Sequence, residues 1–117
     1  MKLIFLVAGG RAGSDFFQGF LDGHSQILQM PGLLNQKIFN LFDESKSEII
    51  AKKFTKIYPH FFNSKLSVRE RHDCLGENKK KYYKVPINKF VSHFSFLMRN
   101  KKFENYLIIK NLHLAYA

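Results

Sequence analysis

Several residue types are scarce or missing in this 117-residue chain, and each gap excludes a class of protein. There is no tryptophan and a single cysteine, Cys74, so neither an internal disulfide nor a zinc site built from several cysteines is available. Long apolar runs are missing too. The longest, residues 3–8, is far too short to span a bilayer and shorter than the apolar region of a typical signal peptide. We therefore expect a soluble, cytoplasmic protein.

Acidic residues are also scarce: 9 Asp and Glu stand against 19 Lys and Arg, which gives a formal net charge of +10. The excess lies in residues 46–117, whereas residues 1–45 are close to neutral. Basicity on this scale attracts polyanions or phosphorylated small molecules, although a solvated lysine-rich surface is the simpler interpretation of most of these side chains. Hydrophobic residues make up 45% of the chain, which suits one core in one small domain.

The N-terminal segments predict a strand, a glycine loop and a helix. A continuous apolar run over residues 2–8 is typical of a strand buried on both faces. The next apolar residues, over 16–21, follow a helical stripe, with Ser14 as N-cap and Gly23 as the stop signal. Residues 27–30 predict a short second extended piece.

The rest of the chain predicts two helices and a further strand. One helix is expected from 46 to 58, with capping-box spacing at its start, and a second begins at Pro86 and ends at Asn100. Residues 63–84 are polar and predict an exposed loop, and the apolar run 106–109 predicts a buried strand. This order indicates an α/β fold with a parallel sheet flanked by helices.

The glycine loop is the segment with the clearest chemistry. Gly10 and Gly13 permit a tight turn before a helix, whose free N–H groups form an anion site, and Ser14 and Arg11 add further donors. A Walker-type loop is disfavoured because no lysine precedes the serine. A dinucleotide-binding fingerprint is a near miss, since residues 27–30 supply no acid for the ribose.

The loop and the helix after it together resemble one known family. RAGSDFF at residues 11–17 and FLDGHSQI at residues 20–27 are similar to the 5′-phosphosulfate loop and first helix of sulfotransferases. Asp15 and Ser25 depart from the family pattern, which has a hydroxyl residue and a proline there. The resemblance implies a P-loop-like α/β fold. It also implies transfer of a sulfuryl group from 3′-phosphoadenosine-5′-phosphosulfate to a hydroxyl or amine, without a metal ion.

The same resemblance assigns the donor site to Arg11, Ala12, Gly13, Ser14 and Asp15. Arg11 takes the place of the basic residue that contacts the bridging and sulfuryl oxygens, where it would neutralise charge on the departing phosphate. Gly13, Ser14 and Asp15 would offer backbone N–H groups to the 5′-phosphate. An acid beside an anion site costs electrostatic energy unless it turns outward as a helix cap.

An acceptor hydroxyl also needs a general base within hydrogen-bond reach. The segment KNLHL at residues 110–114 is similar, with one inserted residue, to the Lys-Thr-His-Leu segment that carries the catalytic histidine of cytosolic sulfotransferases. That resemblance makes His113, just past the predicted strand, the candidate base, and a hydrogen-bonded structural histidine is the alternative. The family's 3′-phosphate site has no match in residues 46–117. We therefore expect residues 1–117 to be the N-terminal part of a sulfotransferase domain that binds its donor weakly and is inactive alone.

Two other functions fit parts of the sequence. Tyr82 and Tyr83 lie beside the lysines Lys79–Lys81 and Lys84, and interleaved aromatic and basic groups can stack on and neutralise a single-stranded nucleic acid. A P-loop nucleotide-binding, kinase-like protein is the other alternative. For a sulfotransferase the expected partner is a small-molecule or glycan acceptor.

Overall fold

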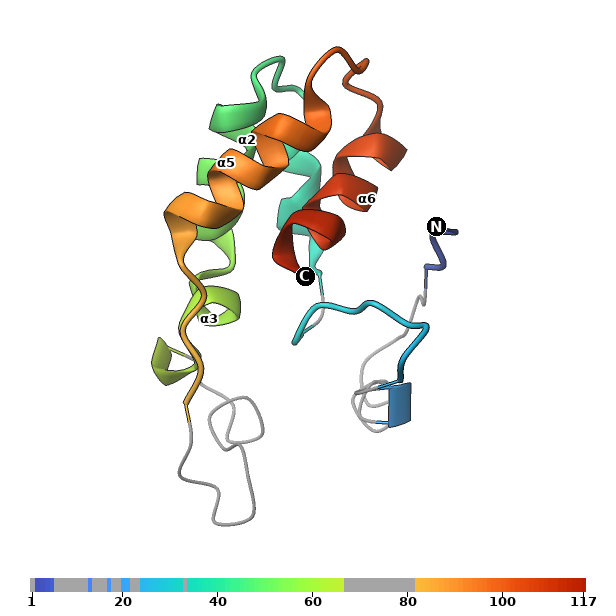
Figure 1. Cartoon of the computed structure of the whole chain (residues 1–117), viewed down its shortest axis with the longest axis vertical. Coiled ribbons are helices and arrows are strands. Elements are labelled where there is room, and N and C mark those ends of the chain that lie inside the picture. Colours follow the sequence, from blue (N-terminus) through green and yellow to red (C-terminus); the bar gives the residue numbers. More distant parts are fainter. Residues whose placement is uncertain are drawn as a thin grey trace.

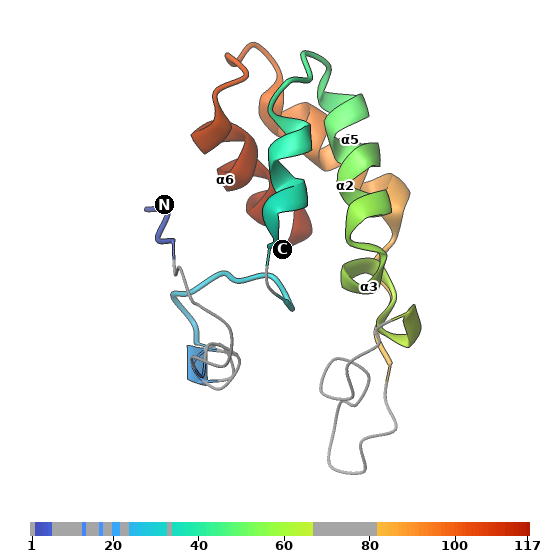
Figure 2. The same cartoon turned by 180° about the vertical axis from the view of Figure 1, so that it is seen from behind.

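Helices supply the regular structure of the folded part of the chain (Figure 1). The computed structural model describes residues 2–5, 13, 17, 20–21, 24–32, 34–66 and 82–117. Their elements are the 3-10 helices η1 (Gln36–Leu41) and η2 (Ser64–Leu66) and the α-helices α2 (Ser47–Ile57), α3 (Pro59–Phe62), α5 (Ile87–Met98) and α6 (Asn105–Tyr116). Helix α5 packs against both α2 and α6, and η1 packs against α2 (Figures 1 and 2).

The predicted parallel sheet, and with it the P-loop-like α/β fold, is wrong. The described residues contain no strand, only an isolated antiparallel bridge between Asn63 and Lys84. Residues 2–5 and 27–30 have no regular structure, and residues 6–8 of the predicted first strand lie outside the described residues. The described part of the chain is helical.

The predicted strand 106–109 lies instead inside α6. Four consecutive apolar residues fit a buried strand or a buried helix equally well, and the residues that follow decide between them. Ile108, Ile109, Leu112 and Ala115 are all buried, and their spacing is that of one face of a helix. That face packs on α5, so helical burial extends past the short apolar run.

The two helices predicted from apolar periodicity are confirmed. Helix α2 buries Ile50, Ala51 and Phe54, but Lys46 is its N-cap and makes no side-chain capping hydrogen bond, so the predicted capping box does not form. Pro59 follows the end of α2 and is the first residue of α3. An N–H at this position would have no partner within the helix, so its absence in proline costs nothing.

Helix α5 begins directly after Pro86 and buries Phe90, Phe94 and Met98 at spacings of four residues. Asn100, two residues past its end, has a φ of 60°. Asparagine tolerates this left-handed conformation better than most residues, so it suits the reversal that leads into α6.

Aromatic rings form the centre of the core. The ring centroid of Phe54 lies 5.0 Å from that of Tyr58, 5.7 Å from that of Phe90 and 6.1 Å from that of Phe62. All four side chains are buried. Aromatic pairs at such distances add specific ring contacts to the burial of apolar area. This cluster fixes α3 and the first half of α5 against α2, where the pocket described below lies.

The helices of the described segments are all too short, or too polar, to cross a lipid bilayer.

Candidate functional site

Of the five residues predicted to hold the donor, the structure describes Gly13, while Arg11, Ala12, Ser14 and Asp15 lie outside the described residues. Gly13 has a φ of 70°, and its carbonyl oxygen accepts a hydrogen bond of 3.0 Å from the N–H of Phe17. A Cβ at this position would meet nothing within 4 Å, so the backbone conformation, rather than lack of space, favours glycine here. Phe17 is helical, as the sequence predicts.

The predicted base, His113, lies on α6 rather than at the end of a strand. Its Nδ1 lies 2.9 Å from the carbonyl oxygen of Ile109, one helical turn earlier. A carbonyl oxygen can only accept, so Nδ1 carries the hydrogen and Nε2 of the neutral ring keeps its lone pair. Burial lowers the pKa of His113, and the hydrogen bond to Ile109 opposes part of that effect. The ring is therefore a neutral imidazole near pH 7.

Gly13 and His113 are not in contact. No hydrogen bond between described residues joins them, and the space within 4 Å of the Cβ position of Gly13 is free. The structure thus places a left-handed glycine turn and a half-buried neutral histidine in the molecule, but it does not bring the two together.

A backbone pairing between distant segments forms one side of an apolar pocket. The N–H of Val85 donates to the carbonyl oxygen of Phe62 over 2.8 Å, and the N–H of Ser64 donates to that of Tyr83 over 3.2 Å. The N–H of Tyr83 in turn donates to Oγ of Ser64 over 3.0 Å, and its hydroxyl donates to the carbonyl oxygen of His60 over 3.1 Å. These bonds hold the segment before α5 against α3.

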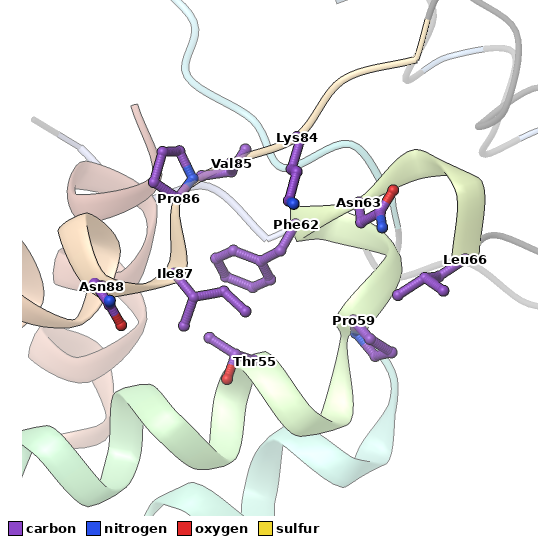
Figure 3. Close-up of a pocket in the computed structure, with 10 residues that line it drawn as sticks. All are labelled: Thr55, Pro59, Phe62, Asn63, Leu66, Lys84, Val85, Pro86, Ile87 and Asn88. Carbon is purple, nitrogen blue, oxygen red and sulfur yellow. The ribbon is translucent and has the colours of Figure 1, made fainter.

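The pocket lies beside this pairing, between the end of α2 and the start of α5 (Figure 3). It has a volume of about 370 Å³ and is mainly apolar. Six apolar residues line it: Pro59, Phe62, Leu66, Val85, Pro86 and Ile87.

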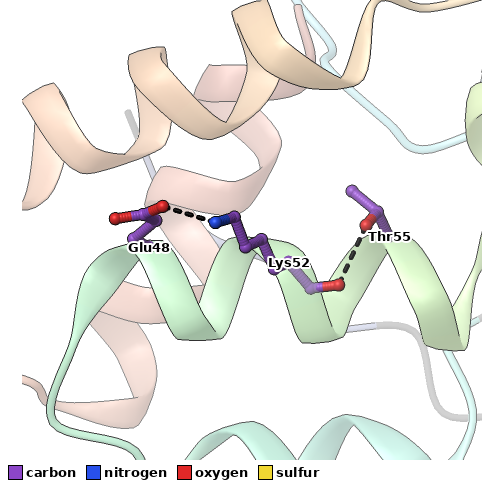
Figure 4. Close-up of polar contacts among 3 residues, drawn as sticks. All are labelled: Glu48, Lys52 and Thr55. Atoms are coloured by element: carbon purple, nitrogen blue, oxygen red, sulfur yellow. Dashed lines mark hydrogen bonds and ion pairs between the residues drawn. The ribbon is translucent and has the colours of Figure 1, made fainter.

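Four polar residues complete the lining: Thr55, Asn63, Lys84 and Asn88. Thr55 turns its methyl group toward Ile87, and its hydroxyl donates to the carbonyl oxygen of Lys52 over 2.9 Å (Figures 3 and 4). Lys84 extends toward Phe62 and is the cation of this pocket.

A second pocket of about 430 Å³ continues along the seam between α2 and α5, and the two share Ile87 and Asn88. Here the ammonium of Lys52 lies 2.5 Å from Oε1 of Glu48, one turn earlier on α2 (Figure 4). The hydrogen bond and charge of Lys52 lower the pKa of Glu48. This ion pair leaves the second pocket without net charge. Oγ of Ser95, which also lines it, is buried without a hydrogen-bond partner in the described part of the chain.

Comparison of the chain with protein-family models, with curated proteins and with solved structures finds no significant match.

The sequence offered no signal for the pocket. In the sequence, Lys84 is part of a basic and aromatic cluster, and Phe62 and Ile87 are apolar residues without a further pattern. The pocket exists because Asn63 pairs with Lys84, and such a pairing between distant segments leaves no periodicity in either of them. Two prolines, Pro59 and Pro86, mark the helix starts beside it but do not predict a cavity.

Proposed function

We propose that the protein transfers a sulfuryl group from 3′-phosphoadenosine-5′-phosphosulfate to a hydroxyl or amine acceptor. The observation that carries the proposal is the backbone at Gly13, within the sequence RAGSD at residues 11–15. Gly13 is left-handed, and its carbonyl oxygen accepts a hydrogen bond of helical spacing from the N–H of Phe17. An anion-binding loop needs this arrangement, because the free N–H groups of the helix start then converge beyond the turn.

Each predicted residue has a defined role in this reaction. The backbone of residues 12–15 binds the 5′-phosphate, and the guanidinium of Arg11 binds the oxygens that gain charge as the phosphate leaves. The acceptor oxygen attacks sulfur, the bond between sulfur and the bridging oxygen breaks, and the acceptor proton passes to a general base. The sequence resemblance gives this role to His113, which the structure does not place in contact with Gly13. The neutral state of His113 supports this role. A small-molecule or glycan acceptor and a cytoplasmic location belong to the same proposal.

Calorimetric titration with 3′-phosphoadenosine 5′-phosphate tests the donor site. We expect weak but measurable binding that Arg11→Ala reduces at least about tenfold, because a hydrogen bond to a charged group contributes about 1.5–3 kcal/mol. Arg99→Ala is the matched control, since it removes the same charge from an exposed position after α5. Equal binding by the two variants would refute the role of Arg11.

One observation favours a second function, the binding of single-stranded nucleic acid. The ammonium of Lys65 lies 5.2 Å from the ring centroid of Tyr82, so a basic and an aromatic group already face each other at an exposed position. A filter-binding assay separates the two functions. Binding of an oligonucleotide that falls steeply with added salt and does not change in Arg11→Ala favours the nucleic-acid function.

A further inference from the structure

The pocket between α2, α3 and α5 combines an apolar lining with one lysine, Lys84. Of the described lysines near it, Lys52 is paired with Glu48, and Lys65 lies over the ring of Tyr82. Lys84 has no carboxylate partner among the described residues.

The backbone pairing places Lys84 at the edge of the pocket. Val85 is half-buried and Lys84 is exposed, and both line the pocket. The side chain of Lys84 extends toward Phe62 (Figure 3). A cation at the rim of an apolar pocket is complementary to a ligand with one negative end and an apolar body.

Two of the other polar groups of the pocket are already engaged. The hydroxyl of Thr55 donates to Lys52, and Oδ1 of Asn63 accepts from the N–H of Lys65 over 3.2 Å. Besides Lys84, Asn88 is the remaining polar residue of the lining, so few side-chain groups are left to recognise the edges of a nucleobase or the hydroxyls of a sugar. An apolar ligand body needs none, and it would cover Ile87, which is 45% exposed between the two pockets.

We propose that this pocket binds a small amphipathic carboxylate, such as a medium-chain fatty acid. Its carboxylate contacts the ammonium of Lys84, and its chain lies on Phe62 and Ile87 and continues toward the second pocket. The pocket volume of about 370 Å³ falls within the range of small-molecule sites, roughly 300–1,000 Å³. This inference does not depend on sulfuryl transfer, because the pocket shares no residue with the donor loop.

The test is a titration of the isotope-labelled chain with decanoate, followed by amide chemical shifts, at concentrations below those at which decanoate forms micelles. Decanol and decyltrimethylammonium serve as probes with the same chain and a neutral or positive head. We expect decanoate to bind most tightly and to shift the amides of residues 55–66 and 84–88. We expect Lys84→Gln to weaken the binding of decanoate at least about tenfold and to leave the binding of decanol unchanged.

Lys89→Gln is the control, because Lys89 is exposed on the same helix and lines neither pocket. Ile87→Ser is the second variant, and it should weaken decanoate and decanol alike. Circular dichroism checks that each variant folds. The proposal is overturned if decanoate does not bind, if decyltrimethylammonium binds as tightly, or if Lys84→Gln and Lys89→Gln behave alike.

Discussion

The hydroxyl of Tyr116, at the end of α6, donates a hydrogen bond to the backbone carbonyl of Phe61 on α3, 55 positions earlier in the chain. Burial, followed by the neighbouring Tyr83, raises the pKa of Tyr116, so the hydroxyl stays protonated and remains a donor. This bond ties the last helix to the short helix beside the apolar pocket.

Replacing that tyrosine tests how much the tie contributes. We expect Tyr116→Phe to lower the free energy of unfolding by about 1 kcal/mol, because a carbonyl at a partly buried site loses its donor. Urea unfolding followed by circular dichroism measures the change. Tyr106→Phe is the control at a ring that is 47% exposed, and it should change stability little. Equal effects of the two substitutions would contradict the role of the hydrogen bond.

A substitution in the aromatic centre of the core should lower the free energy of unfolding far more. Phe54 is fully buried and contacts the rings of Tyr58, of Phe62 on α3 and of Phe90 on α5. Phe54→Ala should cost about 3–5 kcal/mol, which is enough to unfold a domain of marginal stability. Phe96→Ala removes the same side chain on α5, where it is 69% exposed, and should leave the unfolding curve nearly unchanged. A folded Phe54→Ala protein of wild-type stability would show that the core lies elsewhere.

One buried hydroxyl takes part in the pairing beside the pocket. Oγ of Ser64 accepts the N–H of Tyr83, and Ser64 is fully buried. Ser64→Ala should therefore destabilise the protein by about 1–2 kcal/mol, since the N–H of Tyr83 loses the hydrogen bond to Oγ of Ser64. Ser92→Ala is the matched variant at an exposed site on α5, with an expected effect within about 0.5 kcal/mol. Hydrogen exchange at the Tyr83 amide gives a second measurement, which should accelerate only in Ser64→Ala.

The half-buried histidine should make stability depend on pH. The unfolded chain binds a proton at His113 near its ordinary pKa of about 6.5, whereas burial lowers the pKa in the folded state. Above that pH, protonation of His113 therefore does not reduce the free energy of unfolding. This free energy falls as the pH drops through the window between the unfolded and folded pKa values.

Urea unfolding at several pH values within that window measures this contribution. The fall should be smaller in His113→Gln than in the wild type. His93→Gln, at an exposed position on α5, should keep the wild-type pH dependence. A wild-type pH dependence in His113→Gln would mean that the ring is not desolvated.

The sequence predicted the helices better than the fold. Helices α2 and α5 could be predicted because their apolar residues repeat at helical spacing over three turns. Residues 106–109 could not be assigned from four apolar residues alone, and the buried Leu112 and Ala115 show which period applies. The wrong period at this segment, together with the extended pieces predicted at 2–8 and 27–30, led to the predicted sheet.

The same limits apply to the candidate sites. The left-handed glycine was predictable, because the turn before a helix is a local feature of the loop sequence. The burial of His113 was not, since it depends on where α6 packs. The apolar pocket depends on the pairing of Asn63 with Lys84, a contact between segments that nothing in the local sequence specifies.

In the proposed reaction the turn at Gly13 binds the 5′-phosphate end of the sulfuryl donor. Amide chemical shifts of the isotope-labelled chain test it most directly, with 3′-phosphoadenosine 5′-phosphate and adenosine 3′-phosphate, which lacks the 5′ group, as paired ligands. The account predicts that the first ligand shifts the amides of Gly13 and its neighbours, that Arg11→Ala abolishes the shift, and that the second ligand has no such effect. Identical responses to both ligands, or none at Gly13, would contradict it.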